Sequence, residues 1–326
     1  MRNLIAKILK TSPDPLGVRK TTAEVLLNSR LVRINFDKLQ EVANLVKRKF
    51  EKREVLTAEQ FGSDDPTPQL IFVLDAINFC FWAKKGQEKW TVEYPKGNFI
   101  SSGWFALVAS IQRAQEEGTP ILDADYLKNL RLSETKYIFR SANDRPIPLL
   151  KERVRILNEI GAILAEKYQG NIYHFLTETG LDAGKVVTQI VATFPSFEDY
   201  TSFMGKRVNF YKRAQIFAYD LSLLPELKIT NLESLTLFAD YKVPQILRAL
   251  GVLEYDPSLA RKLDEYQILE PGSREEAEIR AATIWSGEFL AHQAGIMPVE
   301  VDNVLWKAAQ SIRDVRPYHR VLTTAY

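Results

Sequence analysis

The chain has 326 residues, 46% hydrophobic and 26% charged, and this length suffices for one large domain or two modest ones. Forty-three basic residues against 41 acidic ones give a net charge of +2, which excludes the strong basic surplus typical of nucleic-acid-binding proteins but leaves a local basic patch open. The single cysteine, Cys80, excludes an intramolecular disulfide. No run of about 18 apolar residues and no signal peptide occurs, so we expect a soluble, cytoplasmic protein.

Residues 1–62 are predicted to be a helical N-terminal part of a single domain that spans residues 1–326. A short amphipathic start is broken by Pro13 and Pro15, and residues 21–50 read as two helices. The second helix has an inward stripe at helical spacing, formed by Leu39, Val42, Ala43, Val46 and Phe50. A polar turn, GSDDPTPQ, then separates this part from the rest.

The apolar run LIFVLDAINFCFW, residues 70–82, favours a buried strand or a strand-to-helix passage. Asp75 and Asn78 are its only polar side chains, and each should be hydrogen-bonded to protein or ligand because burying it unpaired is costly. Cys80 is either a nucleophile or a small buried hydrophobe. The segment KWTVEYPKGNFISS predicts a β-hairpin near residues 89–100, followed by a helix that begins at a serine cap and ends at Gly118.

The remainder of the chain is predicted to be mainly helical, which makes the fold class mainly α with one small β-hairpin. Helices are expected at residues 124–130, 134–139, in a long stretch after Pro148, and at 171–178, 183–194, 197–204, 258–266, 274–294 and 303–314. The three histidines are far apart in sequence and far from the cysteine, so no metal site is expected. No GxGxxG, P-loop, HExxH or GxSxG motif occurs.

In residues 211–245, the lysine Lys212 and the carboxylate Asp240 are flanked by apolar and aromatic residues. On a helix, an apolar stripe from Phe210 to Leu221 lies opposite Lys212. Asp240 lies four residues before Pro244, which suits the first turn of a helix that Gly251 would cap. By residue type alone, Lys212 is a solvated side chain and Asp240 a capping residue.

Several blocks resemble the queuosine salvage protein family, the queuosine 5′-phosphate N-glycosylases. They are LDAINFCFW, SSGWFALVASIQRA, FPSFEDY, YKRAQ, FADYKVPQ and RPYHR, in order from about Asp75 to the C-terminus. The resemblance implies the helical fold of DNA glycosylases, and hydrolysis of queuosine 5′-phosphate to queuine and ribose 5-phosphate without metal or organic cofactor. It places Lys212 and Asp240 in the active site. An acidic residue commonly follows FRS in the family, but Ala142 stands there, so we assign that loop no catalytic role.

Cleaving a ribosyl N–C bond builds positive charge on the sugar, and a fixed carboxylate stabilises it. Asp240 is the candidate for this role, as electrostatic stabiliser, nucleophile or base. A 7-deazapurine lacks N7, so its departure needs an acid or cation at another atom. Lys212 either supplies that help or holds Asp240 ionised, and a Schiff-base role ranks last.

The resemblance also implies a nucleotide-binding site lined by the blocks around Phe79 and Trp104. The aromatic candidates for stacking are Phe79, Trp82, Trp104 and Tyr241, although such residues are also ordinary core residues. Asp75 and Asn78 are candidates for in-plane contacts to the base. For the 5′-phosphate, the candidates by residue type are Arg213, His319 and Arg320, with His319 giving pH sensitivity near neutrality; surface salt bridges and a packed C-terminus are their alternative.

Two other functions stay open. One is a non-enzymatic binding module for modified nucleotides or nucleic acid, which the near-neutral charge disfavours. The other is a DNA-base glycosylase, which needs a basic groove. The expected partner is the small nucleotide substrate, with neither a membrane nor a stable nucleic-acid partner.

Overall fold

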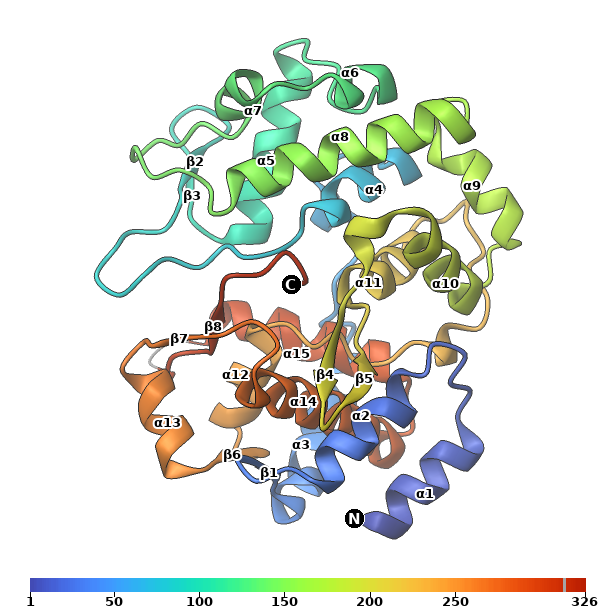
Figure 1. Cartoon of the computed structure of the whole chain (residues 1–326), viewed down its shortest axis with the longest axis vertical. Coiled ribbons are helices and arrows are strands. Elements are labelled where there is room, and N and C mark those ends of the chain that lie inside the picture. Colours follow the sequence, from blue (N-terminus) through green and yellow to red (C-terminus); the bar gives the residue numbers. More distant parts are fainter. Residues whose placement is uncertain (313–314) are drawn as a thin grey trace.

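The structure is a computed structural model that describes residues 1–312 and 315–326, and its described part is mainly helical (Figure 1). The helices are α1 (Arg2–Thr11), α2 (Val18–Leu27), α3 (Phe36–Glu51), α4 (Pro68–Ala76), α5 (Gly103–Glu116), α6 (Ala124–Lys128), α7 (Leu132–Ile138), α8 (Leu150–Lys167), α9 (Ile172–Thr179), α10 (Ala183–Thr193), α11 (Lys212–Leu221), α12 (Lys242–Ala249), α13 (Pro257–Asp264), α14 (Arg274–Ala294) and α15 (Pro298–Ser311). Short 3₁₀ turns occur at Ala58–Phe61, Pro195–Phe197 and Leu232–Ser234. No helix of the described residues is long and apolar enough to cross a membrane.

Short strands form small two-stranded sheets that fasten distant parts of the chain. The antiparallel pairs are β1 (Val32–Ile34) with β6 (Leu253–Tyr255), β2 (Val92–Glu93) with β3 (Phe99–Ile100), and β4 (Tyr200–Phe203) with β5 (Lys206–Asn209). The parallel pair is β7 (Ile268–Leu269) with β8 (Arg320–Val321). The pairs β1–β6 and β7–β8 therefore anchor the N-terminal part and the C-terminal segment to residues 253–269.

The buried apolar side chains form two clusters, one in each half of the molecule. The first is built mostly from α4, α5 and α8–α11, in the upper part of Figure 1. The second is built mostly from α1–α3 and α12–α15, in the lower part. The C-terminal segment runs between the halves, where the Cys80 backbone N–H donates to the Tyr326 carbonyl at 2.9 Å.

Long periodic segments were predicted well. The mainly helical class and the hairpin near residues 89–100 are confirmed, and α14 has the predicted bounds of Arg274–Ala294. The stripe of α3 is buried at Leu39, Val42, Ala43 and Val46. The prediction at 303–314 found α15, but this helix begins earlier, at Pro298. The predicted end of that helix, at Arg313 and Asp314, lies outside the described residues.

Two predicted elements were wrong. Residues 70–82 are not a strand, because α4 occupies Pro68–Ala76 and begins at Thr67, whose side chain accepts from the Leu70 N–H. This helix is buried from Leu70 to Ala76 on every side, so its sequence lacks an amphipathic period. Residues 197–204 were predicted as helix but contain β4, which turns through Met204 and Gly205 at positive φ into β5.

Candidate active site

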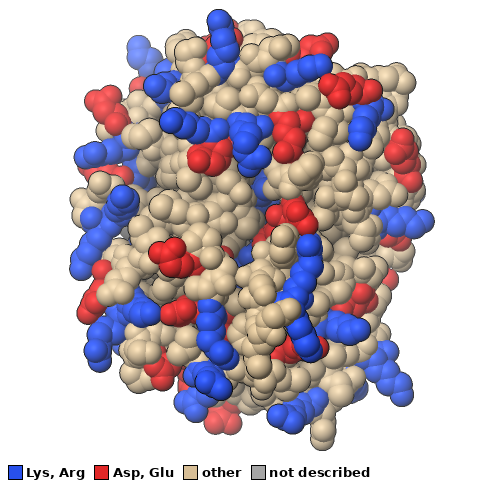
Figure 2. All heavy atoms as spheres, viewed as in Figure 1, with Lys and Arg blue, Asp and Glu red and all other residues tan. Residues whose placement is uncertain are grey.

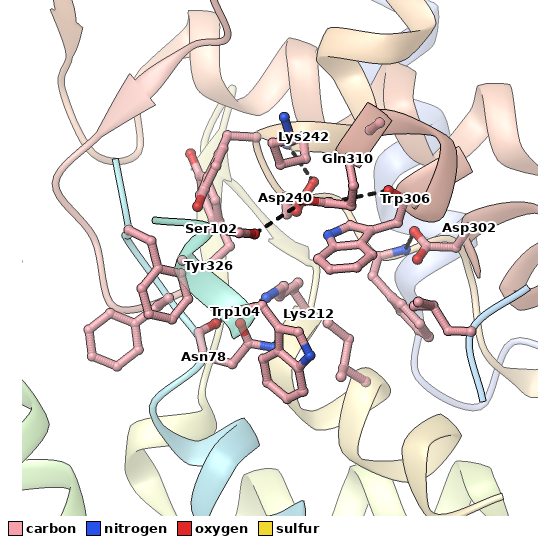
Figure 3. Close-up of a pocket in the computed structure, with 18 of the residues that line it drawn as sticks. Asn78, Ser102, Trp104, Lys212, Asp240, Lys242, Asp302, Trp306, Gln310 and Tyr326 are labelled. Carbon is pink, nitrogen blue, oxygen red and sulfur yellow. Dashed lines mark hydrogen bonds between the residues drawn. The ribbon is translucent and has the colours of Figure 1, made fainter. Parts of the chain in front are cut away.

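A pocket of about 440 Å³ opens at the boundary of the two halves. Residues of the first half that line it include Asn78, Phe79 and Trp104, whereas α15 contributes Asp302 and Trp306. Figure 3 shows the Trp104 and Trp306 rings on either side of the Lys212 side chain. The buried indole nitrogen of Trp104 has no hydrogen-bond partner among the described residues. An aromatic slot with an unused N–H donor suits a flat polar ligand.

Lys212 begins α11 and is buried, with 5% of its surface exposed. Its Nζ donates to the Asn78 carbonyl at 3.0 Å, and its backbone N–H donates to Asp199 Oδ2 at 3.0 Å. Burial lowers the pKa of Lys212, while the carboxyls of Asp240 and Asp75 oppose that shift. The alternative of a solvated lysine is therefore wrong.

Asp240 lies just before α12 and is 7% exposed. Its Oδ1 accepts from the backbone N–H groups of Lys242 and Val243, both at 2.8 Å, which confirms the predicted capping contact. Its Oδ2 has no hydrogen-bond partner among the described residues, and the side chain lines the pocket (Figure 3). Burial raises the pKa of Asp240, and the Lys212 ammonium works against that rise. Within residues 1–312 and 315–326, no ion pair joins the two side chains directly.

Two further carboxyls of the pocket, Asp220 and Asp302, were missed from the sequence. Asp302 Oδ1 accepts from the Phe238 N–H at 3.0 Å, and Asp220 Oδ1 is 3.5 Å from Gln60 Nε2. Burial raises the pKa of each well above its ordinary value, and neighbouring carboxyls add to the rise. An aspartate inside the apolar run of α15 was the available signal, but the predicted start at residue 303 excluded it. The pocket lining therefore includes three carboxyls, those of Asp220, Asp240 and Asp302, together with Lys212.

Comparison with known proteins identifies the family. Residues 58–326 match the family described as queuosine salvage protein. The chain belongs to the queuosine salvage family. This family membership agrees with the resemblance that the sequence blocks carry.

Relatives within the family match over nearly their whole length. A queuosine 5′-phosphate N-glycosylase/hydrolase of Sphaerobacter thermophilus is 38% identical over 96% of this chain and 98% of its own. The proteins of the same name from Mus musculus and Dictyostelium discoideum are 35% and 30% identical, covering 96% and 95% of this chain and 99% and 98% of theirs. The similarity is therefore not confined to the blocks around the pocket.

Of the residues that the family resemblance suggested, several meet in the pocket and two lie outside its lining. Those that line the pocket are Asn78, Phe79, Trp104, Lys212, Asp240 and Tyr241. Trp82 is buried in the first core. Asp75 is fully buried and neither carboxyl oxygen has a hydrogen-bond partner among the described residues. Burial raises its pKa to about 8, against the opposing charge of Lys212, so this acid is mostly protonated at neutral pH.

The structure does not bring the three suggested phosphate ligands into the pocket lining. The Arg213 guanidinium donates to the carbonyls of Ala76 and Ser196 and is buried. Arg320 donates to the Tyr318 carbonyl at 3.1 Å. His319 is buried, and burial together with two neighbouring arginines lowers its pKa to about 3. Its charge therefore does not change near neutrality, contrary to the expected pH sensitivity.

Two other cations line the pocket, Lys89 and Lys242. The Lys242 Nζ donates to Gln245 Oε1 at 3.2 Å, and neither lysine forms an ion pair with a carboxylate in the described part of the chain. Burial lowers the pKa of both side chains, and Lys89 lowers that of Lys242 further. Two cations without a carboxylate between them are suited to an anionic group of a ligand.

Other nucleophile and metal chemistry has little support in the described residues. Burial raises the pKa of the Cys80 thiol to about 11, and Cys80 is not among the residues that line the pocket. The described residues contain no cluster of three or more His, Cys, Asp or Glu side chains that could hold a metal ion. The groups that the pocket offers for chemistry are its carboxyls, its lysines and its aromatic rings.

Proposed function

We propose that this protein hydrolyses the N-glycosidic bond of queuosine 5′-phosphate, releasing queuine and ribose 5-phosphate for queuine salvage into tRNA modification. Family membership and the full-length relatives support the substrate. The observation that carries the chemistry is Asp240, whose Oδ1 is held by two backbone N–H groups while Oδ2 is left for the pocket. A carboxylate fixed in this way suits a sugar carbon that becomes positively charged.

Lys212 keeps Asp240 ionised in this proposal. Burial raises the pKa of the Asp240 carboxyl, and the ammonium of Lys212 is the largest influence that opposes this rise. The Nζ of Lys212 is held by the Asn78 carbonyl at 3.0 Å, so the charge has a fixed place. An ionised Asp240 is needed because a neutral acid would not stabilise positive charge on the sugar.

A protonated acid of the pocket assists the departing base. A 7-deazapurine lacks the N7 atom at which purines are usually protonated, so the proton must go to another atom. Asp302 suits this role because its pKa is raised well above the ordinary value by burial, and because the Phe238 N–H fixes its Oδ1. Trp104 and Trp306 line the same pocket and offer aromatic faces on which the base stacks.

Lys89 and Lys242 are the proposed ligands of the 5′-phosphate, in place of Arg213, His319 and Arg320. Both line the pocket, whereas the guanidinium of Arg213 is engaged by backbone carbonyls. The architecture proposed for the whole chain is that of helical DNA glycosylases, which the helical halves around one pocket support.

Nucleic-acid substrates are less well supported than a free nucleotide. Figure 2 shows basic and acidic side chains interspersed over the visible face, without a continuous basic band. The net charge of +2 agrees with this mixture. A glycosylase acting on duplex DNA, or a module that binds nucleic acid, needs a basic groove along the phosphates.

Chromatography of base release tests the proposal. The purified protein is incubated separately with queuosine 5′-phosphate, queuosine and GMP, and with duplex DNA as a fourth substrate. The proposal expects queuine from the 5′-phosphate in preference to the nucleoside, and no guanine. Release from DNA, or no release while nucleotide still binds, would favour the DNA-base glycosylase or the binding module instead.

A further inference from the structure

One buried arginine, Arg280 of α14, contacts both segments that carry Lys212 and Asp240. Its Nη1 and Nη2 donate to Asp199 Oδ1 and Oδ2 at 2.8 and 2.7 Å, forming a bidentate ion pair. Its Nε donates to the carbonyl of Ala239, the residue before Asp240, at 3.1 Å. Arg280 is 3% exposed and Asp199 is 4% exposed, so water does not loosen these contacts.

Asp199 extends this connection to the other catalytic candidate. Its Oδ2 accepts from the backbone N–H of Lys212 at 3.0 Å, at the first residue of α11. Its backbone carbonyl accepts from the N–H groups of Phe210 and Tyr211 at 3.0 and 3.1 Å. Asp199 therefore fixes the first residue of α11, which is Lys212, and so fixes the backbone position from which the Lys212 side chain extends.

The segment before Asp240 has no regular secondary structure and is held by buried side chains. Gln215 of α11 accepts from the Thr236 N–H at 2.8 Å, and Asp302 of α15 accepts from the Phe238 N–H at 3.0 Å. Arg280 holds the last carbonyl before Asp240. Arg280 also reaches, through Asp199, the start of α11, so it links the two catalytic candidates through a single planar group.

The positive charge of the buried Arg280 guanidinium is neutralised by its immediate neighbours. Asp199 neutralises it through two hydrogen bonds, and the guanidinium stacks on the rings of Phe210 and Tyr326 at 3.9 and 4.4 Å. Rigid charge pairs with satisfied hydrogen bonds are suited to positioning rather than to proton transfer. Arg280 itself is not among the residues that line the pocket.

We propose that Arg280, with Asp199, is a positioning residue that fixes the distance between the side chains of Lys212 and Asp240. This proposal rests on the proposed function, which makes those two side chains the catalytic pair. Arg280 acts through the Ala239 carbonyl on one side and through the Asp199 carboxylate, which accepts from the Lys212 N–H, on the other, and it touches no reacting atom. Lysine cannot replace it, because one ammonium cannot serve both Asp199 oxygens and the Ala239 carbonyl in the geometry of a guanidinium.

The test compares Arg280→Lys with Arg19→Lys as a matched control. Arg19 is also buried and paired, with Nε donating to Glu288 Oε1 at 2.9 Å and Nη2 to the Leu235 carbonyl at 2.8 Å. It also donates to the Glu233 and Ser234 carbonyls, at the far end of the segment that leads to Asp240, but it contacts neither Asp199 nor Ala239. Thermal unfolding, kcat and KM for queuine release are measured for both variants. We expect similar losses of Tm, because each substitution disturbs a buried ion pair.

The kinetic constants separate positioning from stability. For Arg280→Lys we expect kcat to fall about 100-fold with KM within a few fold, because a misplacement of about 1 Å has an effect of this size. For Arg19→Lys we expect kcat to stay within a few fold of the wild type. Equal kcat losses in the two variants, or a wild-type kcat in Arg280→Lys, would overturn the proposal. If Arg280→Lys does not fold, Asp199→Asn is expected to give the same kcat-selective loss, and a wild-type kcat there overturns it equally.

A crystal structure of Arg280→Lys, or of Asp199→Asn, tests the positioning role without any turnover. The proposal expects Lys212 and Asp240 to be displaced relative to each other by about 1 Å. Unchanged positions would overturn it. If the wild-type protein releases no queuine, the proposed function fails, and these structures still decide whether the arginine holds the two side chains in place.

Discussion

Buried charges lie in two regions of this molecule, and the two regions are built differently. Behind the pocket, the Arg280–Asp199 and Arg19–Glu288 pairs are closed by hydrogen bonds of 2.7–3.1 Å to partners on neighbouring segments. In the pocket, Lys212 and Asp240 influence each other's pKa but form no direct ion pair within the described residues. One oxygen of Asp240 is held and the other is left without a partner.

The difference indicates which buried charges are structural. A buried charge with every hydrogen bond satisfied holds segments together, and removing one partner destabilises the fold. A buried carboxyl that has one oxygen without a hydrogen-bond partner reduces the stability of the fold. Such a group is retained where a ligand supplies the missing contact. Substitutions in the first region should therefore reduce stability, and those at Arg280 or Asp199 should also reduce turnover because they displace Lys212 and Asp240. Substitutions in the pocket should reduce turnover and change stability little.

Asp240→Asn is expected to have the largest effect. The amide keeps the capping contacts with Lys242 and Val243 but has no negative charge to stabilise the sugar, so turnover should fall by about 1,000-fold or more while Tm and nucleotide affinity change little. Chromatography of queuine, calorimetry and thermal unfolding measure the three quantities. The matched control is Asp256→Asn, which caps α13 away from the pocket and should leave turnover unchanged. Wild-type turnover in Asp240→Asn would remove Asp240 from the mechanism.

Lys212→Met is expected to reduce turnover about 100-fold and to change its pH dependence. The ammonium of Lys212 opposes the rise in the pKa of Asp240, so its removal should raise that pKa further. Because the proposed mechanism requires an ionised Asp240, the acid limb of the kcat profile should move to higher pH. Lys206→Met, at an exposed position of β5, serves as the control. An acid limb at its original pH would show that Lys212 does not control the ionisation of Asp240.

Trp104→Ala should weaken nucleotide binding more than it slows the chemical step. Loss of one stacking ring is worth about 1–3 kcal/mol, or roughly 5- to 150-fold in Kd. Calorimetry in the Asp240→Asn background measures the affinity without turnover. Trp90→Ala removes another buried tryptophan, whose indole N–H donates to the Phe139 carbonyl, and should leave the affinity unchanged. An unchanged Kd in Trp104→Ala would make Trp104 an ordinary core residue.

Asp75→Asn is expected to act on stability through pH. The folded protein holds the Asp75 proton up to a pKa of about 8, whereas the ordinary value is 3.8. The stability that this proton contributes is present at low pH and is lost as the pH rises between these values. As the pH rises, the wild type should therefore lose this stability while Asp75→Asn does not. The difference between their free energies of unfolding should change by at most about 1.4 kcal/mol per pH unit. Denaturant unfolding at several pH values checks this, with the exposed Asp65→Asn as control; a constant difference would contradict it.

The sequence predicted the elements whose periodicity is strong. The helix at residues 274–294 has its predicted bounds, and the hairpin near residues 89–100 was recognised from its turn. The wrong elements have physical reasons. Helix α4 is buried all round, so its apolar run carries no period of 3.6 residues. Residues 197–204 turn back through Met204 and Gly205, which the helical pattern did not reveal.

The site was predictable only in part. Lys212 and Asp240 could be singled out because a charged residue among apolar neighbours is costly to bury and is often functional. Their roles came from the resemblance to the family. Asp302 was missed because the helix was predicted to begin at residue 303, and because this residue joins the pocket only through the packing of α15. Arg213 was suggested by charge alone, but the carbonyls that occupy its guanidinium depend on tertiary structure.

Comparison of both reaction products from the wild type and from Asp240→Asn tests the central claim most directly. Purified wild-type protein is incubated with queuosine 5′-phosphate, beside the Asp240→Asn variant, and both products are measured by mass spectrometry. The account predicts equal amounts of queuine and ribose 5-phosphate from the wild type, and almost no product from Asp240→Asn. No queuine from the wild type, or equal release by the variant, would contradict it.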